Sequence, residues 1–159
     1  MTRLVPGDVA PAFSLHSAQG KLISLASFAG GKLVLYSYPA AMTSGCTIQA
    51  VDFTAAAAEF EAAGYAICGI SPDTPEKLAK FTSRDSLTIT LLSDPDRTTL
   101  EAYGAWGERS VYGKMITGVI RSTFVIEVDE AGQGTIIEAD YNVKASGHVQ
   151  RLKEKLGLA

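Results

Sequence analysis

Two short segments of the chain are almost entirely apolar, Leu33–Tyr38 and Tyr65–Ile70. Runs of this length and character are typical of strands buried on both faces, as in the centre of a parallel sheet. The first run ends at Pro39, because a proline nitrogen has no hydrogen to donate to a neighbouring strand. We therefore predict two central strands.

A helical pattern follows the first of these strands. From Thr47 to about Ala63, small or apolar side chains recur at steps of three and four residues, the spacing that keeps one face of a helix against a core. They are Ala50, Phe53, Ala57 and Phe60, and Cys46 directly before Thr47 continues the same spacing. Gly64 is suited to end the helix, because glycine tolerates the left-handed backbone found there. Cys46 is thus expected in the first helical turn.

Shorter patterns predict three more stretches of β-structure. Ala12–Leu15 and Leu22–Ser24 flank a turn in which Gly20 can take a positive φ, which indicates an N-terminal hairpin. Leu91–Leu92 is a short strand. A second hairpin is expected from Ser122–Asp129 and Thr135–Tyr141.

Three further helices are predicted between and after these strands. One begins at Pro75 with Thr74 as its cap, one spans Thr98–Tyr103, and one runs from a cap at Ser146 to Leu156. Gly104–Gly118 has no clean period and is interpreted as an irregular connection. It carries Trp106, Tyr112, Met115 and Ile116, which are expected either in a dimer contact or over the active site. The alternation of strands and helices predicts a three-layer α/β sandwich around a mixed sheet.

The length and composition of the chain limit the number of domains and the classes of function that it can have. The 159 residues suffice for a single domain, residues 1–159, and two cysteines indicate no disulfide framework. Fourteen basic and seventeen acidic residues give a net charge of −3 without charge blocks, which argues against electrostatic binding of nucleic acid or membrane. The first residues lack the apolar stretch of a signal peptide, so a reducing cytoplasm is the expected compartment.

Cys46 is the first candidate for chemistry. The unpaired N–H groups and the positive end of the helix dipole in a first turn favour a thiolate over a thiol. Cys68 lies inside the second apolar strand and is interpreted as an inert core residue, with resolution of an oxidised partner after local unfolding as the alternative. Neither histidine has metal-ligand spacing with a cysteine, so no metal is expected.

The order proline, three residues, threonine, two residues, cysteine is formed by Pro39, Thr43 and Cys46, and Arg121 opens a late strand. In this combination the chain resembles the peroxiredoxins, in particular their bacterioferritin-comigratory subgroup. The resemblance implies a thioredoxin-like fold and thiol-dependent reduction of hydrogen peroxide and organic hydroperoxides without a cofactor. It also implies that Cys46 becomes a sulfenic acid, Thr43 contacts the peroxide, Pro39 shields the thiolate and Arg121 is the pocket cation. Tyr38 is expected in the pocket wall or in the core.

The expected electrostatic energies indicate that Arg121 stabilises the Cys46 thiolate more than the helix terminus does. A helix terminus stabilises an anion by only about 0.3–1 kcal/mol, whereas a guanidinium about 4 Å away offers about 4 kcal/mol at an effective dielectric near 20. Arg121 should therefore dominate the stabilisation of the thiolate.

Two positions depart from the pattern of the subgroup. Ser44 replaces a proline before Gly45, so the pocket loop is expected to be more mobile but chemically intact. Val51 replaces the resolving cysteine that many members carry five residues after the reactive one. We therefore predict a one-cysteine cycle in which thioredoxin, a glutaredoxin-type protein or a small thiol reduces Cys46, in a monomer or a homodimer.

Other functions account for the sequence less well. A redox-sensing interaction module, in which oxidation of Cys46 changes a binding surface without turnover, is the main alternative. A thioredoxin-type oxidoreductase is disfavoured because Gln49 stands where the second cysteine of a C-x-x-C pair would be. A phosphate-binding loop is disfavoured because Ala40–Gly45 lacks the required lysine and glycine spacing.

Overall fold

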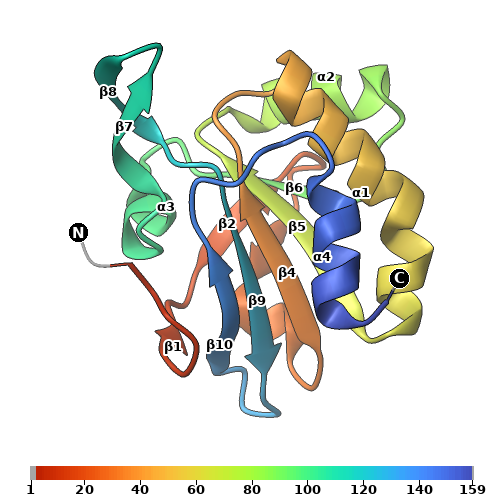
Figure 1. Ribbon diagram of the computed structural model, residues 1–159. Coiled ribbons are helices and arrows are strands. Elements are labelled where there is room, and N and C mark those ends of the chain that lie inside the picture. The colour runs from red at the N-terminus through yellow and green to blue at the C-terminus, as the bar shows by residue number, and fades with distance from the viewer. Residues whose placement is uncertain (1–2, 159) are drawn as a thin grey trace.

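The computed structural model describes residues 3–158 and shows strands and helices alternating along the chain (Figure 1). In chain order the elements are β1 (Val9–Ala10), β2 (Ser14–Ser17), β3 (Leu22–Ser24), the 3-10 helix η1 (Leu25–Phe28), β4 (Lys32–Ser37), α1 (Ser44–Ala62), β5 (Tyr65–Ser71), α2 (Pro75–Arg84), β6 (Thr90–Ser93), α3 (Thr98–Ala102), β7 (Trp106–Val111), β8 (Lys114–Val119), β9 (Ser122–Val128), β10 (Gly134–Asp140) and α4 (His148–Leu156).

Eight of the strands form one mixed sheet in the order β1-β10-β9-β4-β5-β6-β2-β3. Strands β4, β5 and β6 are parallel to one another, whereas β9 runs antiparallel to β4. The two apolar runs predicted from the sequence are the central strands β4 and β5. Their mutual pairing places the carboxyl ends of both at the same edge of the sheet, where α1 and α2 begin (Figure 1).

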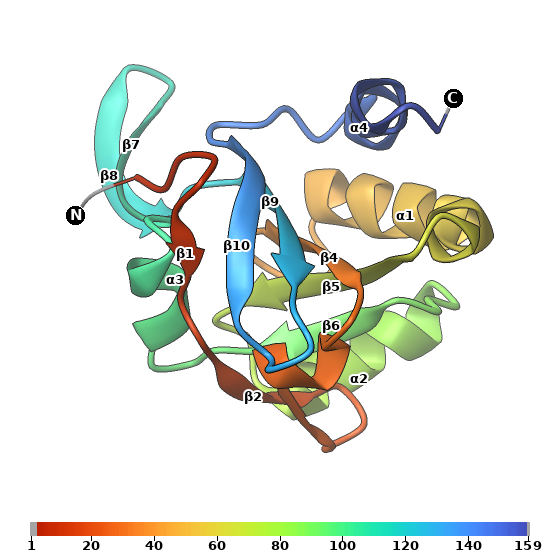
Figure 2. The same ribbon diagram turned by 90° about the horizontal axis from the view of Figure 1, so that it is seen from below.

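Helices cover both faces of the sheet, which confirms the three-layer, thioredoxin-like arrangement. Figure 2 shows α1 and α4 on one side and α3 on the other. Alternate side chains of β4 point to opposite faces of the sheet and belong to two different core clusters. Val34 and Tyr36 join the cluster under α1, α2 and α4, whereas Leu33 and Leu35 join the cluster with α3 and η1. Both faces of β4 are therefore core, which is why its sequence shows no alternation.

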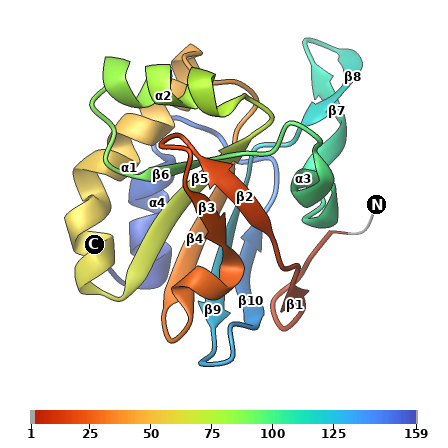
Figure 3. The same ribbon diagram turned by 180° about the vertical axis from the view of Figure 1, so that it is seen from behind.

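The N-terminal hairpin is confirmed. β2 pairs with β3 antiparallel and with β6 at the sheet edge, and Gly20 in the turn has φ +75°. Figure 3 shows this hairpin on the face turned away from α1 and α4. The second hairpin is also confirmed as β9 and β10.

The expectation of an irregular connection over Gly104–Gly118 is wrong. The segment forms the antiparallel hairpin β7–β8, which turns at Tyr112 and Gly113, both with positive φ (Figure 1). The residues of β7 and β8 are exposed or half-buried except Val119, and Tyr112 and Met115 at the far end of the hairpin are exposed. A strand pair with so little buried surface leaves no alternation of apolar and polar residues for the sequence to reveal.

The start of the last helix is also corrected. Gly147, with φ +75°, takes the N-cap position of α4, and Ser146 lies outside the helix, where its carbonyl accepts a hydrogen bond from Arg151. The predicted end at Leu156 agrees with the structure. Among the described helices, none has the length and apolar character needed to cross a bilayer.

Candidate active site

Cys46 lies in the first turn of α1, directly beyond the carboxyl end of β4. The backbone continues from β4 through Tyr38, whose N–H still donates to the carbonyl of Ile70, and leaves the sheet at Pro39. The loop then turns at Met42, which has φ +65°. The sulfur is enclosed, since Cys46 is only 1% exposed and belongs to the core cluster beneath α1.

The pairing of β4 with β9 brings Arg121 to this point. Ser37, the last residue of β4, is paired with Ser122, the first residue of β9. The Ser37 hydroxyl donates to the Ile120 carbonyl and accepts from the Ser122 N–H, which fixes the chain on both sides of Arg121. Arg121 consequently sits beside the loop that follows β4, and its Nη2 lies 3.5 Å from Cys46 Sγ.

Gly45 leaves room for the guanidinium. A Cβ atom at this position would lie 3.2 Å from Arg121 Nη2 and 3.5 Å from the Ala145 Cβ. The guanidinium therefore packs over the bare backbone of the first helical turn. The helix terminus and the arginine thus act on the same sulfur.

Thr43 is the N-cap residue of α1, with φ −84° and ψ 158°. Its hydroxyl does not serve the helix, because it donates to the Ala40 carbonyl over 2.8 Å. With its proton directed into the loop, the exposed Thr43 oxygen can accept a hydrogen bond from a bound O–H group. This differs from the usual N-cap arrangement, in which the threonine oxygen accepts a hydrogen bond from a backbone N–H of the first turn.

Ser44 is exposed at the first helical position of α1. Proline is favoured at this position, and Thr43 before it already has the extended backbone that a following proline requires. Serine therefore occupies a backbone position that is compatible with the proline of the subgroup.

Asp73 holds the loop against the start of α2, a contact that the sequence analysis missed. Its Oδ2 accepts from the Ala41 N–H at 2.7 Å and from the Ser71 hydroxyl at 2.8 Å, and its Oδ1 lies 3.2 Å from Lys77 Nζ. The sequence offers one indication of this contact. Asp73 follows the buried parallel strand β5 by two residues and so lies at the sheet edge where β4 also ends.

Tyr38 belongs to the same buried cluster as Cys46, as does Tyr36. Burial is the largest cause that raises the pKa of both phenols, so both remain neutral hydroxyls. Tyr36 stacks on Phe53 with ring centroids 4.6 Å apart, and Tyr38 packs edge-on against Phe81 with ring centroids 6.3 Å apart. Within the described residues neither hydroxyl has a hydrogen-bond partner. Tyr38 is thus a core residue near the site.

Cys68 lies on the other side of the sheet. It is 1% exposed in the cluster with α3 and η1, whereas Cys46 is in the cluster under α1. Burial raises the pKa of the Cys68 thiol to about 12. Both cysteines are free thiols, and β5 would have to leave the sheet before their sulfurs could meet.

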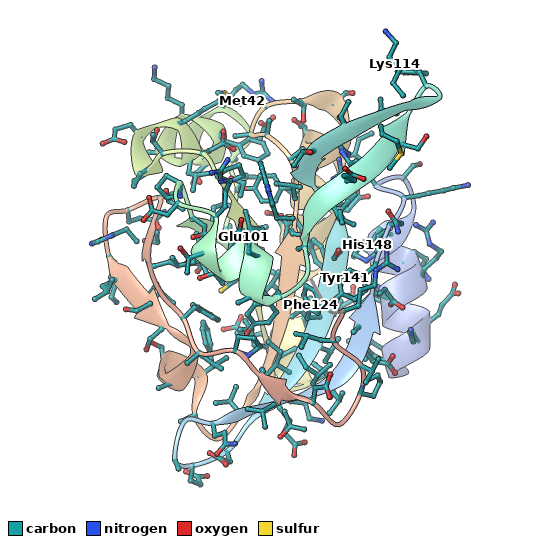
Figure 4. The ribbon with its side chains drawn as sticks, turned by 90° about the vertical axis from the view of Figure 1, so that its left-hand side faces the viewer. Met42, Glu101, Lys114, Phe124, Tyr141 and His148 are labelled. Carbon is teal, nitrogen blue, oxygen red and sulfur yellow. The ribbon has the colours of Figure 1, made fainter. Side chains whose placement is uncertain are left out.

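Three buried polar residues extend the site inward, and the sequence analysis did not identify them. Gln49 and Thr123 are 0% and 1% exposed, and His148, at the start of α4 (Figure 4), is 4% exposed. Gln49 contacts both Arg121 and His148, and His148 contacts Thr123. The only hint in the sequence is that Gln49 follows Cys46 by one helical turn. In the described part of the chain no three His, Cys, Asp or Glu residues are grouped so as to hold a metal ion.

Comparisons with known proteins show the family of the chain. The AhpC/TSA family matches residues 6–132. A protein of Mycobacterium tuberculosis named as a peroxiredoxin is 54% identical over 157 residues, 99% of this chain and 98% of the relative. The peroxiredoxin Bcp of Escherichia coli is 41% identical over 148 residues, 93% of this chain and 92% of the relative.

Solved structures of such proteins have the same fold. The bacterioferritin comigratory protein of Xanthomonas campestris, described by its alkyl peroxide reduction activity, superposes with a TM-score of 0.82 at 32% identity, covering 91% of this chain and 90% of the other. The PrxQ protein of Xylella fastidiosa superposes with a TM-score of 0.87 at 25% identity, covering 99% and 98%.

Proposed function

The chain belongs to the AhpC/TSA family, whose relatives are peroxiredoxins, and we propose that it reduces hydroperoxides through a one-cysteine cycle at Cys46. The family supports a thiol peroxidase in general terms. The observation that carries the specific proposal is the 3.5 Å approach of Arg121 Nη2 to the enclosed Cys46 Sγ in the first turn of α1.

In the proposed reaction the Cys46 thiolate attacks the terminal oxygen of a hydroperoxide. The S–O bond forms as the O–O bond breaks, the sulfur is oxidised to a sulfenic acid, and the departing alkoxide or hydroxide takes up a proton as alcohol or water. Negative charge thus moves from sulfur to the departing oxygen. Fixed hydrogen-bond donors lower the barrier when they lie where that charge develops.

The proposed roles follow from which atoms can donate and which can accept. The Arg121 guanidinium and the N–H groups of the first turn of α1 donate to the peroxide oxygens. Thr43 Oγ1 accepts the hydrogen of the attacked O–H, because its own proton is engaged by the Ala40 carbonyl. Pro39, half-buried at the end of β4, shields the sulfur on the strand side. Ser44 and Gly45 form the loop side of the pocket.

The substrates include organic hydroperoxides in this proposal. The Xanthomonas campestris relative is described by alkyl peroxide reduction, and the pocket loop with Thr43 and Ser44 is exposed, which leaves room for an alkyl group outside the enclosed sulfur.

An external thiol completes the proposed cycle. Cys68 is separated from Cys46 by the central sheet, and residue 51, five positions after Cys46, is a valine. A thioredoxin, a glutaredoxin-type protein or a small thiol must then attack the sulfenic acid, and the reducing cytoplasm is the proposed compartment.

Peroxide consumption by the purified protein tests this proposal. With dithiothreitol or a thioredoxin system present, the wild-type chain and Cys68→Ser should consume hydrogen peroxide and an alkyl hydroperoxide over many turnovers, whereas Cys46→Ser should not. A single equivalent consumed, with no recovery by any reductant, would instead support the redox-sensing module. Equal turnover by Cys46→Ser would refute both.

A further inference from the structure

A line of buried hydrogen bonds leads from the active-site arginine to the start of α4. Arg121 Nη2 faces Cys46 Sγ, and its Nη1 donates to Gln49 Oε1. Gln49 Nε2 lies 3.0 Å from His148 Nδ1, and His148 Nε2 lies 2.9 Å from Thr123 Oγ1. These side chains come from α1, α4, the β8–β9 connection and β9, so the line joins the two outer helices to the sheet.

Each bond in this line has a determined direction. A guanidinium only donates, so the glutamine oxygen must face Arg121 and the glutamine nitrogen must face His148. That nitrogen also only donates, so His148 Nδ1 must be an unprotonated acceptor. The ring proton is consequently on Nε2 and is donated to Thr123 Oγ1. Only one tautomer of a neutral imidazole fits between Gln49 and Thr123.

We propose that His148 is a positioning residue for the peroxidase reaction, which holds the Arg121 guanidinium beside Cys46 by fixing the orientation of the Gln49 amide. The inference rests on the proposed function of Cys46 and adds a residue outside the segment matched by the AhpC/TSA family, residues 6–132. His148 touches neither sulfur nor peroxide and acts through Gln49.

The surroundings keep His148 neutral, as this role requires. Burial is the largest cause that lowers the pKa of His148 to about 4, with Arg151 and Arg121 acting in the same direction and Asp140 against them. The Phe53 ring packs edge-on against the imidazole with centroids 5.7 Å apart, which limits rotation of the ring. Asp140 and Arg151 are the charged groups that face it from β10 and from its own helix.

Removing the acceptor should release the arginine. An apolar residue at 148 leaves Gln49 Nε2 buried without a partner, and the amide can regain hydrogen bonds only by turning, which withdraws its oxygen from Arg121. An arginine side chain has several rotatable bonds and needs such a contact to keep one geometry. A displacement of about 1 Å at a reacting centre can lower a rate by about 100-fold.

Three variants separate positioning from packing. His148→Leu preserves volume but removes the acceptor. His148→Asn restores an acceptor, because its Oδ1 is attached to Cγ as Nδ1 is in histidine. Val149→Ala, at the neighbouring buried position of α4, loosens the packing of the helix without touching the hydrogen bonds. The second-order rate of sulfenic acid formation is measured for each by rapid mixing with hydrogen peroxide, together with the melting temperature.

We expect His148→Leu to lower this rate by about 10- to 100-fold, His148→Asn to restore most of it, and Val149→Ala to melt earlier at an unchanged rate. The inference is overturned if folded His148→Leu reacts as fast as the wild type, if His148→Asn is as slow as His148→Leu, or if Val149→Ala is as slow as His148→Leu. A wild-type protein that does not react with peroxide would defeat the proposed function itself.

The tautomer gives a second test that needs no variant at residue 148. The sequence contains two histidines, the exposed His16 and His148. A His16→Gln protein therefore leaves only the His148 imidazole to observe. Long-range proton–nitrogen correlation at neutral pH should show His148 protonated on Nε2 only. A proton on Nδ1, or on both nitrogens, would contradict the bond directions and with them the inference.

Discussion

Replacing Arg121 with glutamine removes the guanidinium that lies 3.5 Å from Cys46 Sγ. At this distance a full charge pair is attracted by about 5 kcal/mol at an effective dielectric near 20, before the cost of desolvation is subtracted. Part of this attraction stabilises the thiolate before reaction and does not lower the barrier. The rate depends on the stabilisation that the guanidinium gives to the negative charge developing on the departing oxygen in the transition state. One such donor typically contributes about 2.7–4 kcal/mol.

Arg121→Gln should therefore slow oxidation of Cys46 by about 100- to 1000-fold at neutral pH. The rate is measured by rapid mixing with hydrogen peroxide, with the fluorescence of Trp106 as the signal. Arg84→Gln is the matched control, because Arg84 Nη2 also contacts the first turn of α1, at Thr47 Oγ1 over 2.9 Å, without contacting the sulfur. A folded Arg121→Gln protein that reacts within about threefold of the wild type, or an Arg84→Gln protein that is equally slow, would refute the reasoning.

Three further predictions concern the surroundings of this pair. Because the unfolded chain binds a proton at His148 below about pH 6.5 and the folded chain does so only below about pH 4, stability should fall by about 3 kcal/mol as pH drops through this interval. In urea unfolding against pH, His148→Asn should lack that component, and identical slopes for the two proteins would contradict it. Gly45→Ala should change the free energy of unfolding by less than about 1 kcal/mol yet slow peroxide reduction several-fold, since its Cβ would lie 3.2 Å from Arg121 Nη2. Ser44→Pro should raise the free energy of unfolding by about 0.4–1 kcal/mol and leave the rate unchanged, and a slower rate would show that the serine takes part in the chemistry.

Local patterns sufficed to predict the part of the fold that carries Cys46. The apolar run of β4, the proline that ends it and the helical spacing after it depend on neighbours in sequence, and these determine where the thiol lies. The role of Arg121 can be predicted only from the resemblance to the peroxiredoxins, because the approach of its side chain to Cys46 depends on the pairing of β4 with β9.

Other features had no local signal. The hairpin β7–β8 buries little surface and so lacks alternation, and α4 starts after a glycine with positive φ instead of at the serine before it. The bonds from Gln49 to His148 join residues 99 positions apart. Such contacts arise only when α4 docks against α1, and single polar residues in a sequence do not reveal them.

Chemical trapping of the oxidised cysteine tests the central claim most directly. The protein is treated with one equivalent of hydrogen peroxide in the presence of a dione that reacts with sulfenic acids, and the products are identified by mass spectrometry. The account predicts a dione adduct on Cys46, an unmodified Cys68, and loss of the adduct in Cys46→Ser. An intramolecular disulfide between Cys46 and Cys68 as the main product would contradict the one-cysteine cycle, and an unmodified Cys46 would contradict the peroxidase itself.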